Sequence, residues 1–204
     1  MNLHVLVSGS EGNSTLIEGE RTRLLVDCGV SGREAARRLE SVGCPPETLA
    51  AIVVTHEHTD HLQGVGVLAR RFTLPVYLTP GTLAACSDRL KAGVECRVFE
   101  PGKAFTIGDL EVRPFAIPHD ASEPVGFTFH HGSRKVGVAT DLGFSTELAK
   151  RHLSACQLLV LESNHDTEML ASGPYPWELK RRIRSREGHL SNTDAGALLE
   201  EVLH

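Results

Sequence analysis

The sequence predicts a mixed α/β protein in which two β-sheets lie between outer layers of helices, an αββα four-layer sandwich. The first half of the chain alternates between strand-like and helix-like segments, and the second half is richer in strands. The length of 204 residues suits one well-buried core, and no internal repeat, low-complexity tract or linker interrupts it. We therefore expect a single domain spanning residues 1–204.

In the first half, short apolar runs alternate with segments whose apolar residues recur at helical spacing. Ser31 followed by Glu34 is typical of a capping box, which predicts a helix that ends near Gly43. A second amphipathic helix is expected over residues 62–72, and Thr79-Pro80 predicts the start of a third. The expected strands are residues 22–27, 51–55 and 75–79.

The second half is expected to contain hairpins followed by helices. Gly108-Asp109 predicts a tight turn between two strands. Residues 126–130 and 135–139 are strand-like on either side of another turn, and residues 157–162 form a further apolar run. Ser191 with Asp194 resembles a second capping box and predicts a helix that runs almost to the end of the chain.

Composition sets bounds on location and chemistry. No apolar run approaches the roughly 20 residues that span a membrane, and the first residues lack the pattern of a secretory signal. We therefore expect a cytoplasmic protein with no membrane partner. The net charge of −5 gives no global reason to expect nucleic acid as a partner. The cysteines form no C-x-x-C pair and are expected to be buried thiols: Cys28, Cys44, Cys86, Cys96 and Cys156.

The strongest chemical signal is a histidine cluster, Thr55-His-Glu-His-Thr-Asp-His61, between a predicted buried strand and a helix. Residues i and i+2 of an extended loop point the same way, so His56 and His58 can chelate one ion. Asp60 and His61 lie where the helix begins and can face a second ion. Imidazole with carboxylate suits zinc, and also iron or manganese. The alternative, a solvated polar loop, fits this density of ligands poorly.

Two further candidate ligands each follow a predicted strand. His119 ends the run Ala-Ile-Pro-His, and Asp141 ends the run Val-Ala-Thr-Asp. Taken alone, each is typical of a turn or cap residue. Beside the histidine cluster they fit a site with two metal ions, which needs more ligands and a bridging carboxylate.

These motifs, in this order along the chain, resemble those of the metallo-β-lactamase superfamily, and most closely its YycJ-like (WalJ) subgroup. The resemblance spans essentially the whole chain. Besides the metal motifs it rests on residues 8–14 (SGSEGNS), 26–29 (VDCG), 117–121 (IPHDA), 162–166 (ESNHD), 175–177 (YPW), 180–182 (KRR) and 188–192 (GHLSN).

The resemblance implies the metallo-β-lactamase fold with two divalent metal ions, Zn²⁺ or Mn²⁺. One ion would be held by His56, His58 and His119, the other by Asp60 and His61, with Asp141 as bridge. Asp27 would support the metal loop from behind. A hydroxide between the metals would be the nucleophile, its pKa lowered toward about 7.

The resemblance also implies Asp60 and His189 as catalytic residues. His189 would lie near the scissile phosphate, where it could protonate the leaving oxygen or stabilise charge. The alternative is a residue beside a helix start with no catalytic role. Ser8 and Asn13 lie in a Gly/Ser-rich segment that could bind a phosphate through backbone N–H groups, although an ordinary hairpin turn fits it equally well.

A dense basic run at residues 180–186 contains Lys180, Arg181 and Arg182. Such a run is usually a solvated helix face. Here it stands just ahead of His189 in an otherwise acidic chain, which favours a track for a polyanion.

The leading hypothesis for function is a phosphodiesterase with two metal ions that acts as an exonuclease on DNA, with DNA favoured over RNA and a homodimer left open. The rival enzyme is a small-molecule phosphodiesterase or ester hydrolase of the same fold. A different class is a metal-binding module without catalysis, which the intact ligand set disfavours. The absence of a signal peptide disfavours a β-lactamase.

Family members add a late histidine to the second metal position, in a His-Leu-Ser segment beyond the helix that starts near Ser191. The chain stops at His204, which does not lie in such a segment. We therefore expect the last strand to be missing through C-terminal truncation, and the second ion to bind more weakly than the first.

Overall fold

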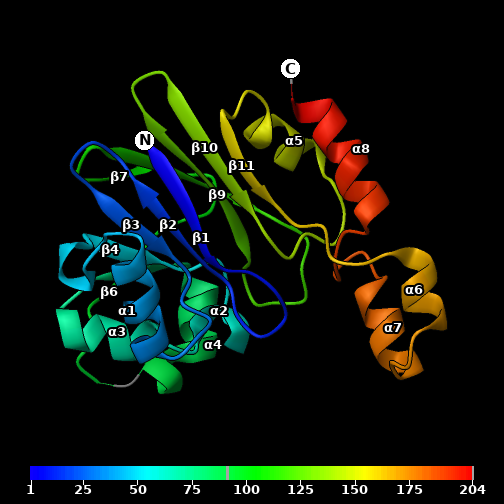
Figure 1. The fold of residues 1–204 in the computed structure, drawn as a ribbon, viewed down its shortest axis with the longest axis horizontal. Coiled ribbons are helices and arrows are strands. Elements are labelled where there is room, and N and C mark those ends of the chain that lie inside the picture. The colour runs from blue at the N-terminus through cyan, green and yellow to red at the C-terminus, as the bar shows by residue number, and fades with distance from the viewer. Residues whose placement is uncertain (91, 204) are drawn as a thin grey trace.

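Two sheets packed face to face form the centre of the molecule, and helices cover both outer faces (Figure 1). The computed structural model describes residues 1–90 and 92–203, so His204 lies outside the described residues. The predicted αββα order of layers and the mixed α/β class are confirmed.

The first sheet contains six strands that follow chain order. They are β1 (Asn2–Val7), β2 (Ser14–Glu18), β3 (Arg23–Val26), β4 (Ala51–Val53), β5 (Val76–Leu78) and β6 (Cys96–Val98). The first three strands pair antiparallel, and β3 to β6 pair parallel. The parallel strands β3 and β4 are apolar along almost their whole length because side chains pack against both of their faces.

The second sheet has the order β11-β10-β9-β8-β7. Its strands are β7 (Phe105–Ile107), β8 (Leu110–Ala116), β9 (Val125–His131), β10 (Arg134–Ala139) and β11 (Leu158–Leu161). Neighbours pair antiparallel except β10 and β11, which are parallel. The predicted turn between β7 and β8 is confirmed, with Gly108 in the left-handed region at φ +59°.

The helices fall into three groups. On the first sheet lie α1 (Gly32–Ser41), α3 (Val65–Phe72) and α4 (Pro80–Leu90), with the short helices η1 (Pro46–Thr48) and α2 (Thr59–Leu62) in the connections. On the second sheet lie α5 (Glu147–Leu153) and α8 (Asn192–Val202). The pair α6 (Thr167–Ser172) and α7 (Trp177–Ile183) stands to one side of the sandwich (Figure 1).

Three apolar clusters fill the spaces between the layers. The central one, between the sheets, includes Ile17, Val53, Phe127 and Phe129, all fully buried. Each such side chain contributes about 1.5–3 kcal/mol through removal of apolar surface from water. The outer clusters join the first sheet to α1, α3 and α4, and the second sheet to α5 and α8. The sandwich is therefore rigid where its strands end, and those ends carry the polar loops.

The expected helix over residues 62–72 is interrupted. It is divided into α2 and α3 at Gln63-Gly64, because the backbone at Gly64 packs against the segment after β3. Gly64 N donates to Cys28 O at 2.8 Å, and a Cβ on Gly64 would lie 2.6 Å from Cys28 Sγ. This close approach fixes the loop after β3 against the metal-binding segment.

The three predicted helix starts are confirmed: α4 begins at Pro80, and a serine caps each of the other two helices. Ser31 Oγ accepts from Glu34 N, and Ser191 Oγ accepts from Asp194 N. At the first of them only half of a capping box forms, because the Glu34 carboxylate pairs with Arg37 and Arg38.

The cysteines are free thiols, and the predicted burial is confirmed for three of the five. Cys28, Cys44 and Cys86 are buried, while Cys96 and Cys156 are half-buried. Burial raises the pKa of Cys28 to about 12, so its thiol stays protonated. Among the described helices, none is long and apolar enough to cross a membrane.

Candidate metal centre

The predicted ligands meet at one end of the sandwich. His56 and His58 follow β4, His119 follows β8, and Asp141 follows β10. β4 runs parallel to β3, and β8 and β10 run in the same direction because both pair antiparallel with β9. The carboxyl ends of these strands therefore deliver polar side chains to a common edge, which is where α/β sheets commonly bind ligands.

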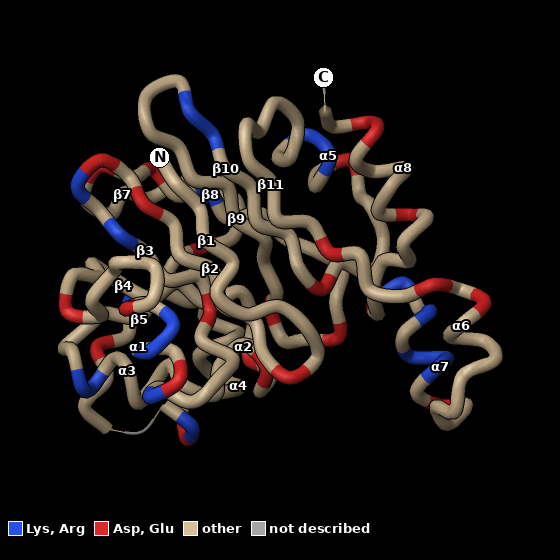
Figure 2. Tube along the Cα trace, viewed as in Figure 1, with Lys and Arg blue, Asp and Glu red and all other residues tan. Residues whose placement is uncertain are grey.

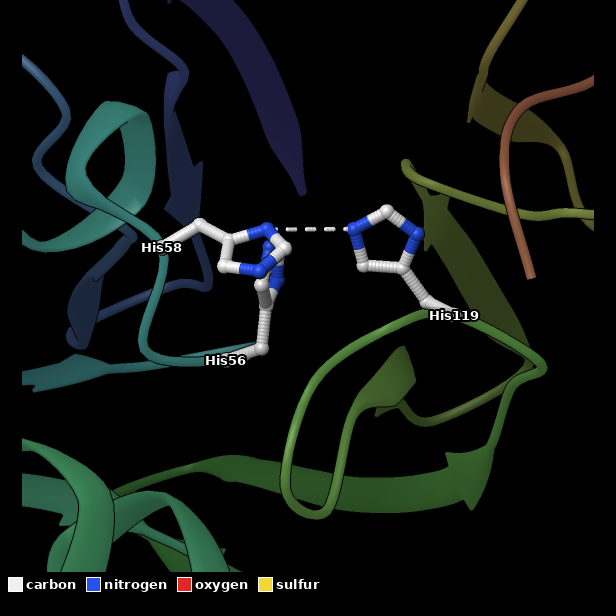
Figure 3. Close-up of side chains that lie close together, drawn as sticks. All are labelled: His56, His58 and His119. Carbon is white, nitrogen blue, oxygen red and sulfur yellow. Dashed lines mark hydrogen bonds between the residues drawn. The ribbon is translucent and has the colours of Figure 1, made fainter. Parts of the chain in front are cut away.

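His56, His58 and His119 form the first cluster (Figure 3). Ligand nitrogens of the three rings lie within 4.8 Å of one another. The His58 and His119 rings point toward each other from opposite sides of the site, and His119 Nε2 lies 3.2 Å from His58 Nδ1. His56 contributes its ring from below the pair, with centroids 4.6 Å from His58 and 4.9 Å from His119.

Hydrogen bonds on the far side of two of these rings select their tautomers. His119 Nδ1 donates to Gly188 O at 3.2 Å, and His58 Nε2 donates to Asp120 O at 3.2 Å. In the neutral rings, the facing nitrogens of His58 and His119 then both carry lone pairs. Burial lowers the pKa of His119, which favours its neutral form. Two lone pairs directed at one point are the arrangement that a cation requires.

His56 is oriented in the same way by Thr55. The Thr55 hydroxyl donates to Asp27 Oδ2 at 2.7 Å and lies 3.0 Å from His56 Nδ1, so that this nitrogen donates to the hydroxyl. His56 Nε2 is buried and has no hydrogen-bond partner among the described residues. Burial also lowers the pKa of His56 well below its ordinary value. A buried, neutral nitrogen without a partner fits a metal ligand.

His61 and Asp141 form a second cluster with His56, again with ligand atoms within 4.8 Å. His61 Nε2 lies 2.8 Å from Asp141 Oδ2 and 3.5 Å from Asp60 Oδ2. Asp141 Oδ2 is buried and makes no hydrogen bond of normal geometry with the described residues. The two clusters adjoin at His56, so the donor set fits divalent cations that share this end of the sandwich.

Asp27 lies behind this second cluster and contacts it through hydrogen bonds. Its Oδ2 accepts from His61 Nδ1 at 2.8 Å, and its Oδ1 accepts from Thr55 N at 2.8 Å. Burial alone would lower the pKa of His61, but the carboxylates of Asp27 and Asp141 outweigh it and raise that pKa well above its ordinary value. Asp27 and Asp141 both have left-handed backbone, at φ +58° and +55°. Such backbone is uncommon outside glycine and often marks functional sites.

Asn13 and Ser8 both lie in the loop between β1 and β2, but only one of them contacts the predicted ligands. Asn13 Nδ2 donates to Asp60 Oδ2 at 3.4 Å and lies 3.1 Å from His61 Nε2. Ser8 is exposed, and no side-chain hydrogen bond joins it to the other described residues. Only Asn13 is therefore brought to the predicted ligands.

His189 lies beside Asp141 and is paired with the carboxylate of Glu162. The sequence pattern did not predict Glu162 as a site residue. Glu162 Oε1 accepts from His189 Nδ1 at 2.7 Å, and Asp141 Oδ1 lies 3.3 Å from the same nitrogen. Glu162 Oε2 accepts from Leu142 N at 2.9 Å, which fixes its orientation. Burial alone would lower the pKa of His189, but Glu162 raises it. The available signal for Glu162 was its position directly after an apolar strand.

The three predicted substrate-binding cations have different surroundings. Arg182 pairs with both carboxylate oxygens of Asp120, the residue after His119, at 2.5 and 2.9 Å. Lys180 Nζ donates to Ala171 O and so ties α7 to α6. Arg181 is exposed and makes no ion pair with a carboxylate of the described residues. Arg182 alone is directly joined to the metal-binding loops.

The fold and these ligand clusters together define a hydrolase that depends on divalent metal ions. Residues 22–203 match the family model described as the Beta-lactamase superfamily domain. The chain belongs to the metallo-β-lactamase superfamily, as its motifs implied.

Particular relatives identify the YycJ-like subgroup. The chain is 40% identical over 208 residues to Exodeoxyribonuclease YycJ of Bacillus anthracis, an alignment that covers 100% of this chain and 78% of the relative. It is 37% identical over 203 residues to Exodeoxyribonuclease WalJ of Streptococcus pneumoniae serotype 2, covering 98% and 76%. Among solved structures, the metallo-beta-lactamase fold protein YhfI from Bacillus subtilis is similar at a TM-score of 0.74, with 20% identity and coverage of 98% and 80%.

Proposed function

We propose that this protein is a phosphodiesterase that acts as an exonuclease on DNA and uses two divalent ions, Zn²⁺ or Mn²⁺. The observation that carries the proposal is the convergence of two ligand clusters with the His189–Glu162 pair at one end of the sandwich. Support for DNA as substrate comes from the exodeoxyribonucleases to which the whole chain is similar.

Each ligand group would have a separate task. His56, His58 and His119 would hold one ion, Asp60 and His61 the other, and Asp141 would contact both. The chemistry that two such ions supply when bound is activation of water and neutralisation of charge on a phosphoryl group. Asp27 keeps His61 oriented, and the carbonyls of Gly188 and Asp120 keep the His119 and His58 rings in the tautomers described.

His189 would act on the leaving oxygen. Its Nδ1 is engaged by Glu162, so the free proton of its protonated ring is on Nε2. Glu162 raises the pKa of His189 against the effect of burial, which keeps this ring protonated to higher pH. A protonated imidazole beside the Asp141 carboxylate can donate to a departing 3′- or 5′-oxygen and contribute general-acid catalysis.

The test compares substrates with the same purified protein and metals. Hydrolysis of bis-p-nitrophenyl phosphate measures the phosphodiesterase chemistry alone. End-labelled DNA duplex, DNA single strand and RNA of the same sequence then measure the substrate class, with Zn²⁺ and Mn²⁺ each added to metal-free protein. We expect metal-dependent release of nucleotides from a DNA end. Cleavage of the small diester without DNA degradation would instead indicate a small-molecule phosphodiesterase, and preferred degradation of RNA would correct the substrate.

A further inference from the structure

We propose that Trp177 and Tyr175 form a base-stacking platform that binds unpaired nucleotides at a DNA end and leads them to the metal centre. The platform is on the arm formed by α6 and α7, residues 167–183. This inference rests on the proposed function, because it assigns to that site a second set of contacts with the same substrate. It adds a role for aromatic rings that the metal chemistry does not use.

Both rings are exposed to an unusual degree. Trp177 is 65% exposed and Tyr175 54% exposed, and they are the only aromatic residues among the large exposed hydrophobic side chains of the described residues. Every phenylalanine, by contrast, is at least half-buried. An exposed tryptophan costs free energy in water unless a partner covers it, so the arm presents a surface suited to a ligand with flat, apolar faces.

The arm itself has little apolar contact with the body. α7 buries no side chain, and α6 buries only Leu170. The arm is therefore not placed by a core that would explain the exposed rings. Polar contacts hold it instead: a backbone bridge between His165 and Ser191 just before α6, and contacts at the C-terminal end of α7, which we call its inner end. Trp177 is the first residue of α7 and so lies at the opposite, outer end.

Positive charge accompanies the rings. Five of the seven residues 180–186 are Lys or Arg, in a chain of net charge −5. In Figure 2 the Cα tube is blue at Lys and Arg positions along α7 and the segment after it. Arg181 and Arg184 have no carboxylate partner among the described residues. Exposed aromatic rings beside unpaired cations are the combination by which proteins bind single-stranded nucleic acid, with the cations on phosphates and the rings on bases.

The inner end of α7 contacts the catalytic segment directly. Ile183 O, at the end of the helix, accepts from His189 N at 3.0 Å. Arg182 from the last turn pairs with Asp120, which adjoins the first metal cluster. Gly188 permits this approach, because a Cβ there would lie 2.3 Å from Ile183 O. The helix therefore points from the catalytic histidine toward Trp177.

The distance along α7 between Trp177 and the end of the helix at His189 suits a few nucleotides. Trp177 and Ile183 are six positions apart in an α-helix, which corresponds to about 9 Å along the axis. Stacked nucleotides rise about 3.4 Å each, so the rings lie about three nucleotides from the end of the helix at His189. A base stacked on the platform would belong to a nucleotide near the scissile phosphate and not to a remote part of the duplex.

The experiment uses the fact that Trp177 is the single tryptophan of the chain. Its fluorescence is measured during titration with the oligonucleotide dT12 in EDTA, where the strand stays intact. We expect strong quenching for wild type. The Trp177→Ala variant, followed by anisotropy of labelled dT12, should bind about tenfold more weakly, and Trp177→Phe should keep most of the affinity because it keeps a ring.

A strand of abasic sites with the same number of phosphates separates stacking from charge. Wild type should bind the abasic strand about tenfold more weakly than it binds dT12, which is the same factor that Trp177→Ala is expected to lose on dT12. Trp177→Ala, which has no tryptophan ring to stack on, should bind dT12 and the abasic strand with similar affinity. The matched control is Val98→Ala, which removes a side chain 57% exposed on β6 and should bind both strands like wild type. The platform is refuted if wild type and Trp177→Ala bind dT12 with equal affinity. It is also refuted if Trp177→Ala weakens binding to dT12 and to the abasic strand by the same factor.

Two further outcomes are informative. A fluorescence change with vesicles of anionic lipid but none with dT12 would show that the arm binds a membrane surface, and would refute the inference. If wild type degrades no nucleic acid, the proposed function itself fails. If wild type degrades DNA and Trp177→Ala degrades it at the same rate below saturation, the platform fails while the proposed function stands.

Discussion

The carboxylate of Glu162 accepts a hydrogen bond from His189 Nδ1 at 2.7 Å, on the side of the ring away from any proton that Nε2 could donate. The two residues come from different elements, because Glu162 follows β11 and His189 precedes α8. The carboxylate thus fixes both the tautomer and the orientation of a histidine beside the metal ligands.

This relationship predicts a pH effect for Glu162→Gln. An acid must hold its proton, so activity that depends on His189 is present below the pKa of His189 and is lost as pH rises through it. Glu162 raises that pKa, so removal of its charge should move the alkaline limb of the pH–rate profile to lower pH. The measurement is a pH–rate profile for bis-p-nitrophenyl phosphate at fixed metal concentration. Glu178→Gln on α7 is the control, and an unmoved limb in Glu162→Gln would remove His189 from the acid role.

The ligand assignment predicts that His58→Ala and Asp141→Ala abolish phosphodiesterase activity while the fold remains. Each removes a group that, in the proposal, contacts a metal ion directly, so the loss should reach about 10³-fold or more. His131→Ala is a matched control, because the His58 and His131 side chains are both 29% exposed and His131 lies at the opposite end of the second sheet. Near-normal turnover with two bound metals in either ligand variant would contradict the assignment.

Local signals account for most of what the sequence predicted correctly. His56 and His58 share a loop, so their spacing alone predicts a common direction for the two rings. Ser31 and Ser191 cap their helices through contacts three residues away. The strand ends that carry His119 and Asp141 were recognisable from apolar runs that stop at a polar residue. Each of these features depends on a few consecutive residues, which is where sequence patterns are most informative.

The remaining features depend on contacts that no local pattern contains. Glu162 and His189 are 27 residues apart, and Asp120 and Arg182 are 62 residues apart. Their approach follows from the way the second sheet, α7 and α8 pack together. The break at Gly64 likewise results from close contact with Cys28, which belongs to another loop. A periodic pattern through residues 62–72 could not reveal that contact.

The basic run predicts different effects for two neighbouring arginines. Arg181→Ala should weaken binding to DNA and reduce the salt dependence by about 0.7–0.9 in log–log slope, the change expected from one lost phosphate contact. Arg182→Ala should in addition slow hydrolysis of the small diester, because it leaves Asp120 unpaired beside His58 and His119. Arg33→Ala on α1 controls for total charge. Equal losses on both substrates for Arg181→Ala would mean that its role is structural.

Metal titration should reveal two unequal sites. The first cluster offers three histidine rings, two of them already held in the ligating tautomer by carbonyl groups. In the second, His61 Nε2 also faces Asp141 and Asn13, so an ion must displace these contacts. We expect calorimetry of metal-free protein with Zn²⁺ or Mn²⁺ to show one tight and one weaker site, and activity to rise as the weaker one fills. Two equally tight sites would refute this order.

The metal loop depends on glycine at position 29. Gly29 N donates to Asn13 O at 2.9 Å, and a Cβ there would lie 1.6 Å from Asp60 O. Gly29→Ala should therefore displace α2 with its ligands and destabilise the protein by about 2–4 kcal/mol, which chemical denaturation measures. Gly196→Ala is the matched control: no atom lies within 4 Å of the added Cβ in α8, and helix propensity should stabilise it by about 0.5–1 kcal/mol. If Gly29→Ala unfolded like wild type and kept its metal affinity, the close contact between Gly29 and the Asp60 backbone would not be what holds the ligands in place.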